Sequence, residues 1–233
     1  MKTINLSNSA LDTINLSSFD KYLMPKYKIP GKEGGYGFYD KSGVEHYSML
    51  AYLSTLYNNK TILDIGTFQG GSALALSYNQ NNKVISVDLK YQVEISTNDL
   101  SNIEFLEGDI LSNNLINPKK TTSIPTTGLL GFESPTSQIK GPELIQSASL
   151  ILYDTVHNGI IEKEFHDHLI KTNWKGICIW DDIKYRWNGD IRQGMQDFWN
   201  SINNNNKMDI TKYSHWTGTG LVWYGDKPEI NLL

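Results

Sequence analysis

The segment "LDIGTFQGGSALAL", residues 63–76, decides the fold class, because it leads from an apolar strand through a glycine turn into an apolar helix. Gly66 lets the chain leave the strand sharply, and Gly70 and Gly71 let the backbone approach a ligand where the helix starts. Asp88 ends the next apolar run, 22 residues after Gly66, where its carboxylate can accept hydrogen bonds from ribose hydroxyls. Because the glycines and this acid occur together, we favour a ligand site over a tight turn that binds nothing.

The sequence on both sides of this segment alternates short apolar runs with amphipathic stretches. The runs predict strands over 61–65, 83–89, 102–108, 149–154 and 176–182. The stretches predict helices over 42–59, 70–79, 93–100 and 160–172. Since each predicted strand is apolar throughout, the alternation indicates an α/β protein whose parallel sheet is covered by helices on both faces.

The C-terminal part of the chain follows a different pattern. A helix is predicted over 189–202, with Asp190 as its N-cap, followed by strands over 208–213 and 220–225. The short connection between these two strands cannot form a parallel crossover, so one of them should run antiparallel.

Domain organisation is predicted from the position of the irregular segments. Residues 1–42 are polar and glycine-rich, which indicates an irregular or short-helical segment before a main domain over 43–233. Residues 118–142 are rich in Pro, Gly, Ser and Thr and are interpreted as an inserted loop. This loop follows the third predicted strand, so it begins at the carboxyl edge of the sheet, where ligands of α/β proteins bind.

Composition excludes several classes of protein. A net charge of −4 argues against binding to nucleic acid through phosphate contacts, and the only arginines are Arg186 and Arg192. The single cysteine, Cys178, lies in an apolar run and is expected to be a core thiol, with no disulfide framework and no cysteine zinc site. No apolar stretch is long enough to span a membrane and the N-terminus lacks the apolar block of a signal peptide, so we expect a cytoplasmic protein.

The motif series "LDIGTFQGGSALAL", "VISVDL" (84–89) and "IEFLEGDI" (103–110) resembles that of class I S-adenosylmethionine (SAM)-dependent methyltransferases. It is similar in particular to small-molecule O-methyltransferases of the catechol and macrolide-sugar types, over roughly residues 43–225. The resemblance implies a Rossmann-like fold with a seven-stranded, mostly parallel sheet and an antiparallel C-terminal strand. It also implies a set of SAM-binding residues: Asp64, Gly66, Thr67, Phe68, Gly70, Ser72, Asp88, Leu89, Gly108, Asp109 and Asp154. Within this set, Asp64, Gly66 and Ser72 would lie along the methionine part, Asp88 at the ribose, and Gly108 and Asp109 at the adenine.

Three acidic residues end two of the predicted strands. Asp154 follows the fourth strand, and Asp181 and Asp182 follow the fifth, which are neighbours in the strand order 3-2-1-4-5 expected of this fold. Carboxylates that converge repel one another unless a cation joins them, and oxygen ligands without cysteine indicate Mg²⁺ or Mn²⁺ rather than zinc. The positions match the acidic triad of the metal-dependent O-methyltransferases, in which the metal would lower the pKa of an acceptor hydroxyl.

His157 lies three residues after Asp154, where the similar enzymes place a lysine or histidine general base. A neutral imidazole near pH 7 suits removal of a proton from a metal-bound hydroxyl. The alternative is that Asp154 and Asn158 cap the next helix and His157 is a polar surface residue. Two further histidines have less support. His46 could face the site from its helix, but a surface ion pair with Glu45 is favoured, and His215 is interpreted as part of a hairpin turn or an acceptor pocket.

The sequence therefore predicts a SAM-dependent, Mg²⁺-assisted O-methyltransferase that acts on a hydroxyl of a small molecule, sugar or glycan. The loop over 118–142 would act as a lid over this acceptor, and the chain would bind neither nucleic acid nor membrane; homo-oligomerisation is left open. One alternative is a catalytically silent protein of the same fold that serves as a binding or scaffold partner. Another is an NAD(P)-linked oxidoreductase, but the glycine spacing G-x-x-x-G-G differs from the dinucleotide fingerprint G-x-G-x-x-G.

Overall fold

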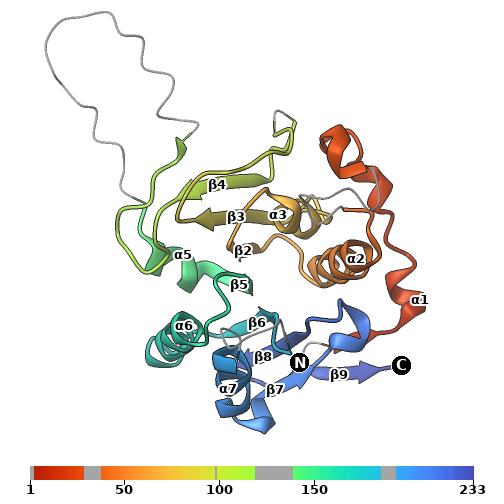
Figure 1. Ribbon diagram of the computed structural model, residues 1–233. Helices are drawn as coiled ribbons and strands as arrows, with labels where there is room; N and C mark the ends of the chain where they lie inside the picture. Colours follow the sequence, from red (N-terminus) through yellow and green to blue (C-terminus); the bar gives the residue numbers. More distant parts are fainter. Residues whose placement is uncertain (1–2, 29–37, 98, 119–138, 185–192) are drawn as a thin grey trace, which may run out of the picture.

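A computed structural model describes residues 3–28, 38–97, 99–118, 139–184 and 193–233 (Figure 1). Most of the predicted insertion over 118–142, with its predicted role as a lid, lies outside the described residues. So does the first part of the helix predicted over 189–202, including its predicted N-cap Asp190.

The described residues form an α/β arrangement of strands, α-helices and short 3₁₀-helices. The strands are β1 (Thr3–Leu6), β2 (Thr61–Ile65), β3 (Lys83–Asp88), β4 (Ile103–Glu107), β5 (Ala148–Tyr153), β6 (Gly176–Asp181), β7 (Lys207–Asp209), β8 (Thr219–Tyr224) and β9 (Glu229–Leu232). The α-helices are α1 (Asn8–Leu11), α2 (Lys41–Thr55), α3 (Gly71–Leu76), α5 (Gly141–Ser147), α6 (Ile160–Lys171) and α7 (Gln193–Ser201). The 3₁₀-helices are η1 (Leu16–Phe19), η2 (Pro25–Lys28), η3 (Asn204–Asn206) and η4 (Thr211–Tyr213).

The main sheet has seven strands in the order β4-β3-β2-β5-β6-β8-β7 (Figure 1). The first five strands of this order pair in parallel, and β8 pairs antiparallel with both β6 and β7. The predicted order of the five parallel strands and the predicted antiparallel C-terminal strand are both confirmed. This is the Rossmann-like arrangement that the sequence predicted.

Helices cover the sheet on both of its faces. Side chains of neighbouring strand residues point to opposite faces, and they divide between two buried apolar clusters. In β5, for example, Leu150 and Leu152 pack with α2 and α3, whereas Ile151 and Tyr153 pack with α5, α6 and α7. Cys178 lies fully buried in the second cluster, as the sequence predicted for a core thiol.

Three predictions of local structure were wrong. The strand predicted over 208–213 ends at Asp209, and Thr211–Tyr213 form a 3₁₀-helix instead. In the segment predicted as a helix over 93–100, the described residues 93–97 are not helical, because the amides of Glu94 and Ser96 donate to the carbonyls of Gln69 and Tyr22 rather than to a helical partner. The N-terminal segment is not only irregular or helical, because β1 pairs in parallel with β9 near the C-terminus. That pairing joins residues more than 200 positions apart, so no local pattern could indicate it.

The carboxyl ends of β2, β3, β4, β5 and β6 meet at one edge of the sheet, which is where the candidate site lies. The chain leaves β2 through the glycine turn and enters α3 directly, as the opening segment predicted. In the described part of the chain, no helix has both the length and the apolar character needed to cross a membrane.

Candidate active site

A cavity of about 610 Å³ opens at this carboxyl edge, a volume typical of small-molecule sites. All of the predicted SAM-binding residues except Asp64 and Gly70 line it. The same cavity is also lined by His46 from α2 and by Tyr47 beside it. One cavity therefore contacts both the glycine turn and the end of β5.

The glycine turn is held close to the end of β5 by its backbone conformation. Gly66 has φ of +99°, which favours glycine, and a Cβ there would lie 1.5 Å from the carbonyl oxygen of Asp154. The Gly66 amide donates to the carbonyl of Val87 at 2.9 Å, which ties the turn to β3 as well. Gly70, with φ of +96°, is the residue from which α3 starts. The turn is thus built around a glycine that no other residue can replace without movement of β5.

Asp88 lies where the sequence placed it, at the end of β3 and in the cavity wall. Its Oδ2 accepts the amide hydrogen of Phe68 at 2.7 Å, so the acid also orders the glycine turn. Gly108 donates its amide to the carbonyl of Asp88 at 2.8 Å, which brings the end of β4 to the same place. Leu89 and Phe68 line the cavity with exposed side chains, at 72% and 49%. The arrangement fits a ligand with a ribose near Asp88 and an apolar, planar group near these side chains.

Asp64 lies under the turn and is fully buried. Its Oδ2 accepts hydrogen bonds from the hydroxyls of Ser72 at 3.1 Å and Ser86 at 2.5 Å. Its Oδ1 has no hydrogen-bond partner among the described residues. Burial raises the pKa of Asp64 to about 7. A buried carboxylate oxygen without a donor, next to a cavity-lining serine, fits the cationic amino group of a bound ligand.

At the end of β5, Asp154 and His157 form a close pair that Asp182 joins from the adjacent strand end. The Nε2 of His157 lies 3.1 Å from Oδ1 of Asp154 and 3.6 Å from Oδ2 of Asp182. His157 and Asp182 both have positive φ, 57° and 55°, which is uncommon for residues other than glycine. Strained backbone of this kind is typical of functional sites, where the surrounding structure enforces it.

The helix-cap alternative is confirmed for Asn158 but wrong for Asp154 and for His157 as a surface residue. The side chain of Asn158 accepts the amide hydrogens of Ile160 and Ile161 at 2.8 Å and 3.2 Å. Glu162 accepts the amide hydrogens of His157 and Gly159 at 2.9 Å and 2.7 Å. These two side chains cap α6, and His157 is not a surface residue, because only 12% of its side chain is exposed. The carboxylate of Asp154 is therefore available to the cavity.

The charges around His157 change its expected protonation. Burial lowers the pKa of His157, but the hydrogen bond to Asp154 and the charges of Asp154, Asp182 and Asp181 outweigh it and raise the pKa to about 9. Burial and the neighbouring Asp181 raise the pKa of Asp182 to about 6. The neutral imidazole expected from the sequence is thus disfavoured at pH 7 while both carboxylates face this ring.

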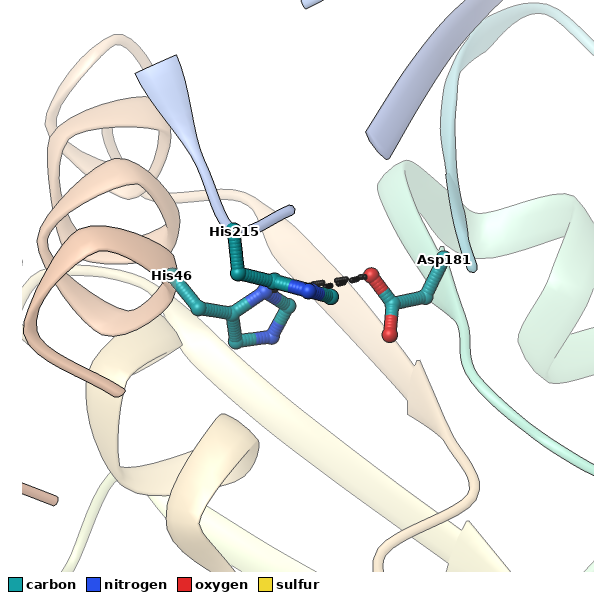
Figure 2. A group of neighbouring side chains, drawn as sticks. All are labelled: His46, Asp181 and His215. Atoms are coloured by element: carbon teal, nitrogen blue, oxygen red, sulfur yellow. Dashed lines mark hydrogen bonds and ion pairs between the residues drawn. The ribbon is translucent and has the colours of Figure 1, made fainter. Parts of the chain in front are cut away.

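Asp181 contacts two histidines that come from distant parts of the chain (Figure 2). Its Oδ1 lies 2.9 Å from Nε2 of His215 and 3.8 Å from Nδ1 of His46. These histidines hold the pKa of Asp181 below its usual range despite burial, and burial lowers the pKa of His46. The interpretation of His46 as a surface residue paired with Glu45 was wrong, because His46 is only 8% exposed. The proximity of His46 and His215 to Asp181 is the part of the site that sequence reasoning missed.

The predicted metal triad is only partly assembled. Asp154 and Asp182 both lie within 4 Å of one atom, the Nε2 of His157. The third predicted ligand, Asp181, instead forms a hydrogen bond with Nε2 of His215 through its Oδ1. Among the described residues, the group of ligating atoms that all lie within 4.8 Å of one another is His46, Asp181 and His215.

The comparisons with known proteins identify the fold. No family model matches the chain, and no curated protein matches its sequence. Solved structures do match: the SAH-bound methyltransferase of Podospora anserina has a TM-score of 0.50 at 15% identity, with 80% of each chain covered. A Staphylococcus aureus protein solved under a provisional assignment as a caffeoyl-CoA O-methyltransferase has a TM-score of 0.50 at 16% identity, covering 77% of this chain and 82% of that one. A cofactor-bound protein from MTB, Rv0187, has a TM-score of 0.50 at 12% identity, covering 95% and 92%. The fold of this chain is that of class I SAM-dependent methyltransferases.

Proposed function

We propose that this chain is a SAM-dependent O-methyltransferase that acts on a hydroxyl of a small molecule, sugar or glycan. The observation that carries the proposal is one cavity that Gly66, Asp88, Asp154 and His46 all line. A donor bound on the glycine turn would lie beside the acid–histidine residues at the ends of β5 and β6, where an acceptor could be deprotonated. The fold similarity reported above supports the same reaction class.

The cofactor end of the cavity offers contacts for each part of SAM. Asp88 would accept hydrogen bonds from the ribose hydroxyls, and Gly108 and Asp109 would border the adenine. The unpartnered Oδ1 of Asp64 suits the cationic amino group of the methionine part. When bound, SAM supplies a methyl group on a cationic sulfur, and the protein's contribution is to hold that methyl in line with the acceptor oxygen.

At the acceptor end, His157 is the residue proposed to remove the hydroxyl proton. The proton would move from the acceptor oxygen to Nε2 of His157 as the oxygen forms its bond to the methyl carbon, while the bond from that carbon to the cationic sulfur breaks and its electron pair stays on the sulfur. The paired carboxylates of Asp154 and Asp182 favour the protonated ring, so His157 becomes a base only when another cation takes over part of their charge.

Mg²⁺ or Mn²⁺ is the cation proposed for that role, because carboxylate oxygens are the ligands that hard cations prefer. Asp154 and Asp182 would hold it, with Asp181 as the third acid of the predicted triad. When bound, the ion supplies a positive charge that lowers the pKa of an acceptor hydroxyl. The convergence of Asp154 and Asp182 on one cationic atom supports this assignment.

The first experiment is a calorimetric titration of the wild-type chain with SAM, SAH and NADH. We expect SAM and SAH to bind and Asp88→Ala to weaken both by about tenfold or more, since a ribose hydrogen bond to a charged group contributes about 1.5–3 kcal/mol. Asp167→Ala is the control, because this acid pairs with Lys163 on the exposed face of α6. Binding of NADH without SAM would overturn the proposal in favour of an oxidoreductase.

The second experiment measures methyl transfer from labelled SAM to a panel of phenols, sugars and glycans, with and without EDTA. We expect turnover on at least one hydroxyl acceptor, with Asp154→Ala and EDTA both abolishing it. Turnover that survives both changes would contradict the metal-assisted mechanism. Tight SAM binding with no transfer to any acceptor would favour the silent scaffold alternative.

A further inference from the structure

We propose that His46, Asp181 and His215 form a binding site for a divalent first-row transition metal such as Zn²⁺, separate from the carboxylate pair Asp154 and Asp182. The three residues come from α2, the end of β6 and the connection that leads into β8, and their side chains meet in the interior (Figure 2). The proposal shares only Asp181 with the magnesium triad, and it is tested by metal binding rather than by turnover.

The ligating atoms lie at distances that a metal ion could bridge. The Nε2 of His215 is 2.9 Å, and the Nδ1 of His46 is 3.8 Å, from Oδ1 of Asp181. Zinc bonds of about 2.0–2.2 Å to nitrogen and oxygen in tetrahedral geometry separate neighbouring ligand atoms by about 3.3–3.6 Å. The distances of both nitrogens from Asp181 are close to this separation, so small side-chain movements bring the three ligands to one ion.

The hydrogen bonds around His215 leave its Nε2 facing a carboxylate. The other ring nitrogen of His215, Nδ1, contacts the hydroxyl of Thr217. If Thr217 accepts the Nδ1 hydrogen, the lone pair of Nε2 points at the Oδ1 lone pairs of Asp181, and the lone pair of His46 approaches the same oxygen. In that tautomer a metal ion would lie between these lone pairs; in the other tautomer the Nε2 hydrogen of His215 is donated to Asp181, and in both the hydroxyl of Thr219 donates to the same oxygen at 3.3 Å. Histidine ligands fixed by a hydrogen bond through the second nitrogen are the common arrangement at metal sites.

The backbone that carries His215 is held firmly against the segment after β6. The amide of Gly218 donates to the carbonyl of His215 at 3.1 Å, and the amide of Lys184 donates to the carbonyl of Thr217 at 2.8 Å. Gly218 has φ of +100°, and a Cβ there would lie 2.8 Å from the Lys184 amide nitrogen. This close packing fixes His215 relative to Asp181 before any ion binds, which lowers the entropic cost of forming the site.

The donor set distinguishes this site from a magnesium site. Two imidazoles and one carboxylate suit zinc, iron, cobalt or nickel, whereas Mg²⁺ prefers oxygen ligands. Three protein ligands also leave a coordination position open, as in catalytic zinc sites. Because His46 lines the cavity, that open position is expected to face the space proposed for the acceptor.

The experiment is a titration of the metal-stripped wild-type chain with Co²⁺, followed in the visible spectrum, and with Zn²⁺, followed by elemental analysis after gel filtration. We expect one ion per chain and no displacement by an equal concentration of Mg²⁺. Thr217→Val should weaken binding by about 10- to 100-fold, and His46→Ala and His215→Ala by more. His168→Ala, which changes a partly buried histidine on α6, is the matched control and should bind as the wild type does.

The folding of each variant is checked by thermal unfolding without metal, and Thr217→Val keeps all three ligands should an alanine variant fail to fold. Zn²⁺ should also raise the Tm of the wild type but not that of His215→Ala. Unchanged affinity in His46→Ala and His215→Ala, or no transition-metal binding by the wild type, would overturn the proposal. Loss of Co²⁺ binding in Asp154→Asn but not in the histidine variants would overturn it too, because the ion would then lie at the other carboxylates.

Discussion

The carboxyl edge of the sheet has two halves that are built in different ways. The cofactor half, at the ends of β2, β3 and β4, is shaped by backbone conformation, as in the left-handed Gly66 and the amide of Phe68 that donates to Asp88. The acid–histidine half, at the ends of β5 and β6 and before β8, consists of charged side chains in contact, such as His157 with Asp154. Changes in the first half should act through steric strain, and changes in the second through charge.

The largest effect is expected from Gly66→Ala in the cofactor half. The new Cβ would lie 1.5 Å from the Asp154 carbonyl oxygen, and φ of +99° adds strain of its own. Together these should lower the free energy of unfolding by more than about 3 kcal/mol and abolish SAH binding. Denaturant titration and calorimetry measure the two effects.

Gly225→Ala separates the strain of a positive φ from the clash with the backbone of β5. Gly225 also has φ of +99°, but a Cβ there would meet only the Cδ of Lys175, at 2.7 Å, and that flexible side chain can move away. This variant should lose about 1–2 kcal/mol and keep its SAH affinity. An equal loss in both variants would show that the contact of the turn with β5 contributes nothing.

In the acid–histidine half, the stability of the protein should fall as the pH rises. His157 has its pKa raised from 6.5 to about 9, so its stabilising contribution is complete below 6.5 and is lost as the pH rises through about 9. The wild type should therefore lose about 2–3 kcal/mol of unfolding free energy over this range relative to His157→Asn. Asparagine is chosen because it tolerates the positive φ of this position.

Asp154→Asn tests whether the carboxylate of Asp154 causes the raised pKa of His157. Removal of its charge should bring the pKa of His157 back toward 6.5, as followed by NMR titration of the imidazole, and should reduce the pH dependence of stability. A His157 pKa that stays near 9 in this variant would show that the ion pair with Asp154 does not control the protonation of the ring.

A second pH effect, from an acid rather than a base, is expected from Asp64 in the cofactor half. Burial raises its pKa from 3.8 to about 7, so its contribution is present below 3.8 and is lost as the pH rises through about 7. Between these values the wild type should lose about 4 kcal/mol relative to Asp64→Asn, measured by denaturant titration at several pH values. Asp167→Asn, on the exposed face of α6, should keep the wild-type slope, and a flat wild-type profile would contradict the assignment.

The two halves also differ in how far the sequence could predict them. The strand, turn and helix around Gly66 are consecutive in the chain, so β2 begins and ends at the predicted residues. The proximity of Asp154 to Asp182 followed from the predicted strand order, because the carboxyl ends of neighbouring parallel strands meet. His46 and His215 could not be placed, since their approach to Asp181 depends on how α2 and the connection before β8 pack on the sheet. The protonation of His157 likewise depends on side-chain distances that spacing along the chain does not give.

The smallest effect is expected from Phe68→Gly, which separates stability from binding within the cofactor half. Phe68 has φ of 43°, and relief of a left-handed conformation contributes about 1 kcal/mol, which should offset the lost contacts of a ring that is 49% exposed. The unfolding free energy should thus change by less than about 1 kcal/mol, whereas SAH should bind about fivefold more weakly because the ring lines the cavity. Asn173→Gly, at φ of 54° after α6, is the control, and its SAH affinity should stay at the wild-type value. If both variants bind SAH as the wild type does, the strained backbone at Phe68 serves the packing of the turn rather than the ligand.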